Sequence, residues 1–193
     1  MPLPECIRIP FDDQVRRDEL LALGWREIEV LETWTGNAPD APYSKIRAET
    51  ATKADRDDLQ NLAVDSFKYD RLHSDPQVRK IDADAAKAKW VDDALNDPSR
   101  VVTVVRRADG IAGFLIYRAD RQRKVRAMVI DLLAVDERHR RKGIALQLVA
   151  QAAKAGGFRK IKAGTQSTNE PARAFYKGMR MKVGRKQRTF HRP

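Results

Sequence analysis

The sequence has little cysteine, little histidine and no long apolar run. Of its 193 residues, Cys6 is the one cysteine, and three are histidines. A single thiol cannot close an internal disulfide, and no cysteine or histidine cluster has the spacing of metal ligands. We therefore expect no bound metal and a reducing, cytoplasmic setting. The first residues lack a basic segment followed by an apolar run, and no stretch is long enough to span a bilayer, so neither a secretory signal nor a membrane span is expected.

The composition indicates a folded, soluble chain with an uneven charge. Hydrophobic residues make up 42% and charged residues 34%, and the length allows one core with a small appendage. Residues 1–135 contain 22 Lys and Arg against 24 Asp and Glu, a net of −2, whereas residues 136–193 contain 16 against 3, a net of +13. This excess indicates an anionic partner of the last third, either nucleic acid or a phosphate-rich small molecule. A solvated basic surface is the plain alternative.

The chain is expected to divide at residue 44. Residues 1–44 form a small N-terminal extension, with a strand at 6–9, a helix at 13–23 ended by Gly24, a strand at 25–34 and a linker rich in turn formers at 35–44. The extension is too small to fold alone. Residues 45–193 form the main domain.

The main domain mixes strands with helices. Thr52 and Asp55 resemble a capping box, and Ala108-Asp109-Gly110 lies between two apolar runs as in a β-hairpin. We predict an α/β fold with a partly antiparallel sheet. The expected strands are 46–49, 101–107, 111–118, 125–135, 161–165 and 181–191, and the expected helices are 59–67, 81–95, 143–155 and 171–179.

The most specific feature is a basic turn between an apolar strand and a helix, at residues 132–148. Gly143 lets the backbone turn tightly and approach a ligand. The first amides of the following helix lack internal acceptors and lie at the positive end of its dipole, which suits a diphosphate. Arg140, Arg141 and Lys142 would add positive charge. Taken alone, the turn could also be an ordinary strand-to-helix connection.

Two motifs together resemble the GNAT superfamily of N-acetyltransferases, over residues 45–191. The first is Arg140-x-x-Gly143-x-Ala145 with the preceding Leu-Ala-Val strand, and the second is Asn169-x-x-Ala172-x-x-Phe175-Tyr176. The resemblance implies the GNAT fold, a central mixed, mostly antiparallel sheet flanked by helices. It also implies that acetyl-CoA is the cosubstrate and that no metal is needed. The residues it implies for acetyl-CoA are Leu133, Ala134, Val135, Arg140, Arg141, Lys142, Gly143, Ile144, Ala145, Asn169, Ala172 and Phe175.

The resemblance also suggests two catalytic residues. Tyr176 would protonate the leaving thiolate, and its alternative is an ordinary core residue. Asp131, expected on the strand face opposite Leu132 and Ala134, would bind the amine or relay its proton. A structural, hydrogen-bonded aspartate is the alternative. The family usually has glycine where this sequence has Arg180, which puts the loop after the helix in doubt, and Gly178 is a candidate to end that helix early.

The acceptor is predicted from a narrower resemblance to bacterial acetyltransferases of TDP-4-amino-sugars such as TDP-fucosamine. It covers residues 66–76, 164–169 and 189–191 and suggests that Arg71 and His73 bind substrate; His73 could equally be a capping or loop residue. Direct attack by the neutral amine would need no covalent enzyme intermediate. Homodimer formation is left open.

Three alternatives remain. The acceptor could be a protein N-terminus, a lysine or a polyamine, which would suit the neutral-to-acidic first two thirds. The domain could bind acetyl-CoA without catalysis, against which Tyr176 argues. The basic third could bind nucleic acid, but it carries no nucleic-acid motif and no interleaved aromatic residues.

Overall fold

The computed structural model of the protein describes residues 3–40, 45–120 and 125–192. The chain divides into two compact units, each assembled from segments that are distant in sequence. Unit 1 comprises Met1–Thr35, Lys68–Asp84 and Gly164–Pro193, and unit 2 comprises Gly36–Phe67 and Ala85–Ala163. A division at residue 44 into an extension and a domain stays a prediction, because compactness does not tell which segment folds alone.

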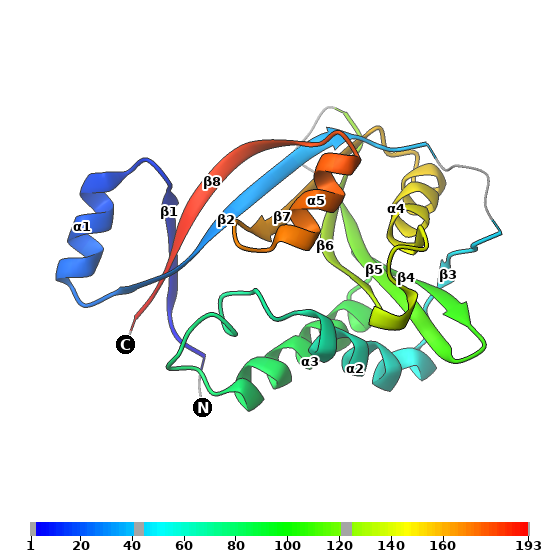
Figure 1. Cartoon of the computed structure of the whole chain (residues 1–193), viewed down its shortest axis with the longest axis horizontal. Coiled ribbons are helices and arrows are strands. Elements are labelled where there is room, and N and C mark those ends of the chain that lie inside the picture. Colours follow the sequence, from blue (N-terminus) through cyan, green and yellow to red (C-terminus); the bar gives the residue numbers. More distant parts are fainter. Residues whose placement is uncertain (1–2, 41–44, 121–124, 193) are drawn as a thin grey trace. The chain divides into compact units, whose positions relative to one another are not determined.

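Unit 1 is built around the last strand of the chain. Strand β8 (Lys182–His191) lies between β1 (Cys6–Pro10) and β2 (Arg26–Asn37) and is antiparallel to both (Figure 1). The register places His191 opposite Cys6 on one side and opposite Arg26 on the other. The two strands expected in the N-terminal extension therefore both pair with the C-terminal strand.

Helices flank these strands within unit 1. Helix α1 (Gln14–Ala22) begins where the Asp13 carboxylate accepts the N–H of Arg16, and it is followed by Gly24 at a φ of 82°. Its Leu20 packs into a small apolar cluster with Ile9, Trp25 and Phe190. Helix α5 (Glu170–Gly178) follows strand β7 (Lys160–Gln166), whose last residues belong to this unit.

Unit 2 contains a mixed sheet. Strands β3 (Glu49–Thr50), β4 (Arg100–Arg107), β5 (Gly110–Asp120) and β6 (Ala127–Val135) follow one another with antiparallel pairing. Strand β7 then pairs with β6 in parallel. A parallel neighbour needs a crossover, which α4 (Ile144–Ala155) provides. The expected mixed, mostly antiparallel sheet is confirmed, and so is the hairpin around Gly110, which has a φ of 116°.

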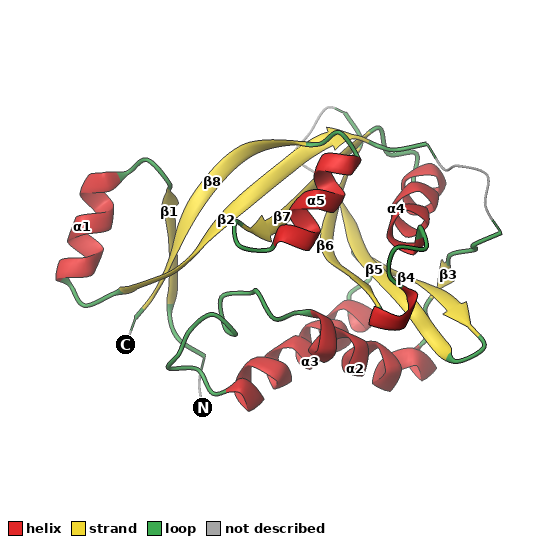
Figure 2. Cartoon of the chain, in the orientation of Figure 1, coloured by secondary structure: helices red, strands yellow, loops and turns green. Residues whose placement is uncertain are grey.

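The helices of unit 2 cover both faces of its strands. Helices α2 (Arg56–Ser66) and α3 (Lys80–Asn96) lie together on one side and α4 lies on the other (Figure 2). The core under α2 and α3 includes Leu59, Val91 and Phe114. The predicted capping box is confirmed, since the N–H of Thr52 donates to Asp55 at 2.7 Å beside the short helix η1 (Lys53–Asp55). No helix in the described part of the chain is both long and apolar enough to cross a membrane.

Two expected elements differ in the structure. The sequence predicts a strand at 46–49, but only β3, at Glu49–Thr50, forms. The Gln151 side chain donates to the carbonyl of Ile46 at 2.9 Å and accepts the N–H of Ala48 at 3.1 Å, so these backbone groups do not pair with another strand. The linker expected at 35–44 begins later, because β2 continues to Asn37; residues 41–44 of that prediction lie outside the described residues.

Candidate active site

The turn between β6 and α4, in unit 2, has the backbone of an anion site. Gly143 caps α4 with a φ of 81°, a left-handed conformation that glycine adopts without strain. A Cβ added there would meet no atom within 4 Å, so the glycine serves the backbone conformation and leaves room above it. Its carbonyl accepts the N–H of Gln147 at 3.0 Å, in the first turn of α4. The amides before Gln147 have no acceptor within the helix and lie at its positive end. This arrangement suits a phosphate group.

Three consecutive basic side chains surround this turn. Arg140 donates through Nε to the carbonyl of Val135 at 3.2 Å, and Lys142 donates to the carbonyl of Arg138 at 2.9 Å. Arg141 is exposed and itself adopts a left-handed φ of 62°. Because they are exposed and follow the preceding helix η2 (Glu137–His139), these side chains can turn toward a bound diphosphate.

Gly113, which sequence reasoning missed, holds the turn close to the sheet. A Cβ at this residue of β5 would lie 2.9 Å from the carbonyl oxygen of Ala134 and 3.0 Å from Cγ2 of Ile144. Only glycine therefore allows β5 to come so close to the end of β6 and the start of α4. The available signal was a glycine inside an apolar strand.

Strand β6 presents the alternation that its sequence predicts. Leu132 and Ala134 are buried, whereas Asp131, Leu133 and Val135 are only partly so. The Asp131 carboxylate accepts from Arg100 at 3.0 Å and from Arg118 at 3.3 Å. Both of its oxygens are thus bonded to guanidinium groups, the arrangement expected of a structural aspartate.

Helix α5, in unit 1, carries the second motif. The Asn169 side chain caps it by accepting the N–H of Ala172 at 3.2 Å, which leaves the amide N–H₂ group as a separate donor. The helix runs to Gly178, but the left-handed residue after it is Arg180, with a φ of 57°. The chain therefore ends this helix with arginine in the conformation that glycine usually supplies. Gly178, considered as an early end, is the last residue of the helix, one residue before the predicted end at 179.

Tyr176 lies on the buried face of α5. Its ring centre is 6.0 Å from that of Trp34 on β2 and 5.6 Å from that of the adjacent Phe175. Burial raises the pKa of the Tyr176 hydroxyl well above its usual value of 10.0, so the phenol keeps its proton at neutral pH. The buried indole N–H of Trp34 has no hydrogen-bond acceptor among the described residues.

Arg71 and His73 lie in unit 1, and hydrogen bonds hold both of them. The His73 ring bonds to Asp70 at 2.8 Å through Nδ1 and to Asp84 at 3.0 Å through Nε2. Arg71 lies 2.8 Å from Nε2 of His191, whose Nδ1 lies 2.7 Å from the buried Asp75. Both ring nitrogens of His73 are engaged, which fits the alternative of a structural loop residue. Arg71 is positioned by a buried partner and stays partly exposed.

The predicted residues thus fall into two groups. The first, in unit 2, comprises Asp131, Leu133, Ala134, Val135, Arg140, Arg141, Lys142, Gly143, Ile144 and Ala145. The second, in unit 1, comprises Arg71, His73, Asn169, Ala172, Phe175 and Tyr176. In the described residues no group of three His, Cys, Asp or Glu side chains is arranged to hold a metal ion.

A family model matches the part of the chain that holds both motifs. The chain belongs to the acetyltransferase (GNAT) family, whose model matches residues 56–179. It is therefore an acetyltransferase, as the two motifs suggested. No curated protein sequence matches the chain significantly.

Solved structures share the fold at low sequence identity. A functionally unknown conserved protein from Staphylococcus epidermidis ATCC 12228 matches with a TM-score of 0.71 and 14% identity, over 96% of this chain and 71% of that one. A GCN5-related N-acetyltransferase from Sphaerobacter thermophilus matches with a TM-score of 0.63 and 13% identity, over 98% of this chain and 60% of that one. AAC(6')-Iy, in complex with the bisubstrate analogue CoA-S-monomethyl-acetylneamine, matches with a TM-score of 0.51 and 15% identity, over 70% of this chain and 90% of that one. These likenesses confirm the predicted α/β GNAT fold.

Proposed function

We propose that this chain transfers the acetyl group of acetyl-CoA, by direct attack, to a primary amine of a nucleotide-linked amino sugar. The observation that carries the proposal is the turn at Gly143. Gly143 has a left-handed conformation and open space around its Cα, and the first amides of α4 follow it. This arrangement suits a diphosphate, and the chain belongs to the GNAT family.

Within this proposal the β6–α4 turn binds the pyrophosphate. The amides from Gly143 to Ala145 donate to its oxygens, and residues 140–142 neutralise its charge. Leu133, Ala134 and Val135 offer backbone groups to the pantetheine arm, and an amide of this strand polarises the thioester carbonyl. Asn169, Ala172 and Phe175 contact the same arm.

Tyr176 acts as the proton donor to sulfur. A phenol with a raised pKa is a weaker acid than free tyrosine, but it is protonated at every pH at which an amine reacts. As the carbon–sulfur bond breaks, the developing thiolate draws a hydrogen bond and then the proton from this hydroxyl. Burial around the ring also excludes water that could hydrolyse the thioester.

Asp131 is the less favoured candidate for handling the amine proton. Arg100 and Arg118 already bond to both of its oxygens, which supports a structural role in holding β4, β5 and β6 together. Arg71 is better placed to contact the acceptor, since His191 orients it and its side chain is partly exposed. His73 would act indirectly, by fixing the backbone conformation of the segment that carries Arg71 through its bonds to Asp70 and Asp84.

The test is thiol release from acetyl-CoA with TDP- and UDP-4-amino-sugars, polyamines and peptides. We expect turnover with an amino-sugar nucleotide, and Tyr176→Phe should lower kcat about 10²- to 10⁴-fold while the Kd for acetyl-CoA is unchanged. Tyr117→Phe is a matched control, because Tyr117 is also buried and also has a raised pKa but lies on β5. It should keep full activity.

Each other outcome has a definite meaning. Turnover with peptides or polyamines alone would replace the acceptor and keep the acetyltransferase. Acetyl-CoA binding without turnover would indicate a binding domain. Absence of acetyl-CoA binding, together with salt-dependent DNA binding, would overturn the proposal in favour of nucleic acid.

A further inference from the structure

Glu29 is a buried carboxylate with one oxygen, Oε2, that accepts no hydrogen bond of normal geometry among the described residues. It lies on β2 and is 8% exposed. Its Oε1 accepts from the hydroxyl of Thr189 at 3.1 Å and lies 3.7 Å from a guanidinium nitrogen of Arg8. Its Oε2 is buried and has no hydrogen-bond donor among the described residues. A buried carboxylate oxygen without a hydrogen-bond donor lowers the stability of the fold, so its presence indicates a functional rather than a structural role.

Glu32, three residues further along the same strand, shows what a structural carboxylate looks like here. It is also buried, at 1% exposed, yet it pairs with Arg173 and with Lys186, both at 3.1 Å. Burial alone would raise the pKa of Glu32, but the two cations together lower it. Burial raises the pKa of Glu29 above its usual 4.5, and the side-chain hydrogen bonds from Gln166 and Thr189, with the positive charge of Arg8, lower it without offsetting the effect of burial. Glu29 therefore has the greater affinity for a proton.

The neighbours of Glu29 come from segments already connected with catalysis in unit 1. Thr189 lies on β8, two residues before His191, which holds Arg71. The negative charge of Asp70, in the segment that also carries His73, acts on Glu29 and favours its protonated form. Gln166 ends β7, three residues before the Asn169 cap of α5. Glu29 thus lies close to the segment of Arg71 and His73, which is expected to bind the acceptor. It also lies close to Gln166, at the end of the strand that leads to the helix of Tyr176.

We infer that Glu29 binds the ammonium group of the acceptor through Oε2 and takes its first proton, an inference that rests on the proposed function. The ligand is a primary ammonium, because a positively charged donor satisfies a buried carboxylate oxygen and a neutral hydroxyl does so less well. The N-terminal strand β2 therefore supplies part of the acceptor site.

The proton balance of the step is complete. The ammonium gives one proton to Glu29, and the freed lone pair on nitrogen forms a bond to the thioester carbonyl carbon. The carbon–sulfur bond breaks and its electron pair leaves on sulfur, which takes the proton of Tyr176. The second nitrogen proton replaces the one that the phenol lost, and Glu29 releases its proton to water. One ammonium and one thioester become one amide, one thiol and one proton.

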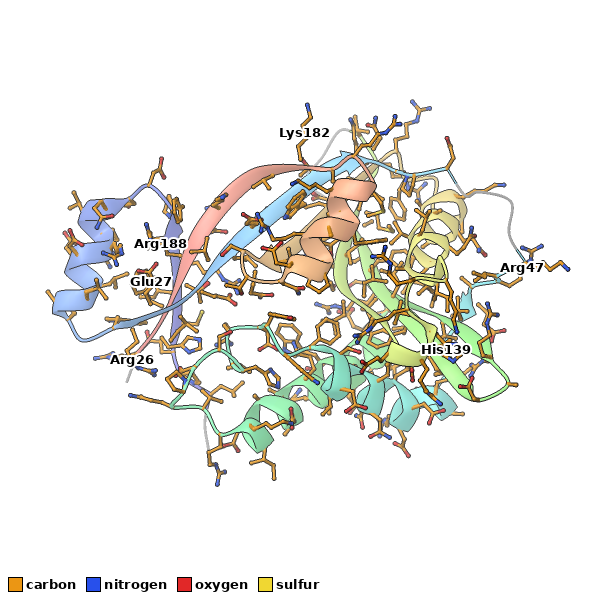
Figure 3. The ribbon with its side chains drawn as sticks, viewed as in Figure 1. Arg26, Glu27, Arg47, His139, Lys182 and Arg188 are labelled. Atoms are coloured by element: carbon orange, nitrogen blue, oxygen red, sulfur yellow. The ribbon has the colours of Figure 1, made fainter. Side chains whose placement is uncertain are left out.

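The experiment compares Glu29→Gln with Glu27→Gln. Glu27 lies on the same strand, but its oxygens are paired with Arg17 at 2.8 Å and with Arg188 at 2.6 Å, and Figure 3 shows Glu27 close to Arg188. With the fastest amine of the panel, Glu29→Gln should lower kcat/KM about 10²- to 10⁴-fold and remove the acidic limb of its pH profile. Acetyl-CoA affinity, measured by calorimetry, should stay unchanged. Glu27→Gln should keep the rate and the limb.

A second variant, Thr189→Val, leaves the carboxylate in place. Losing a hydrogen bond to the ionised form raises the pKa of Glu29, so the acidic limb should move to higher pH. This result would support the inference even if Glu29→Gln did not fold. Two results would overturn the inference about Glu29 and leave the proposed function standing, provided that the wild type is active. One is an acidic limb of the pH profile that is unchanged in Thr189→Val, and the other is a folded Glu29→Gln with full activity. A wild type that transfers acetyl to none of the amines would overturn both.

Discussion

Replacing Asp75 with asparagine should strongly destabilise the protein. Asp75 is 1% exposed and accepts from Arg26 through both oxygens, from the N–H of Gln77 at 2.9 Å and from His191 at 2.7 Å. Because Arg71 donates to Nε2 of His191, the proton of that ring must sit on Nδ1 and point at Asp75. An asparagine N–H₂ group would therefore face two other donors.

The magnitude follows from the same contacts. Burial alone would raise the pKa of Asp75, but Arg26 and His191 hold it at about 2, against a usual 3.8. This lowering corresponds to roughly 2–3 kcal/mol of stability for the ionised form. Opposed donors and an unpaired Arg26 add to the loss, so Asp75→Asn should lower the free energy of unfolding by about 3–5 kcal/mol. In a chain of this size the expected fall in Tm is roughly 6–20 °C.

Urea denaturation as a function of pH is the decisive assay. A group whose pKa is lowered by folding stabilises the protein above its unfolded pKa, and this stabilisation disappears as the pH falls through the folded value. The difference between wild type and Asp75→Asn should therefore be complete above about pH 4 and shrink toward pH 2. Asp82→Asn is the control, because the Arg79 partner of Asp82 is 65% exposed and such an ion pair contributes little, so this variant should stay close to wild type. A difference below about 1 kcal/mol at pH 7, or one that does not change with pH, would refute the reasoning.

Two further predictions concern one substitution to glycine and one substitution of a glycine. Arg180→Gly should raise the free energy of unfolding by about 0.5–1 kcal/mol, because Arg180 is exposed and held at a φ of 57°, and a lower urea midpoint would contradict this. Gly113→Ala should lower it by about 1–3 kcal/mol, since its Cβ would meet the carbonyl of Ala134 at 2.9 Å. It should also weaken acetyl-CoA binding, measured by calorimetry, because Ile144 starts the helix of the phosphate turn; unchanged stability and affinity would contradict that account.

Local sequence patterns predicted most of the elements. The capping box of Thr52 and Asp55, the hairpin at Gly110 and the glycine at the start of α4 all depend on bonds between residues close in the chain. The strand expected at 46–49 was wrong for the opposite reason, because the partner of its backbone is Gln151, a hundred residues away. No local pattern reports such a bond.

The candidate site shows the same limit. The sequence by itself determined the family, through two motifs whose glycine, basic residues and tyrosine have chemical roles at a fixed spacing. Only the tertiary structure decided that β2 and β1 both pair with β8, that Asp131 lies between two arginines, and that Glu29 is buried with one oxygen unpaired. A glutamate on a strand predicts a solvent-facing residue until the strands beside it are known. Burial and pairing depend on residues of other strands, 13 and 31 positions away for Asp131 and 160 positions away for Glu29 and Thr189, whereas turns and caps are set by their immediate neighbours.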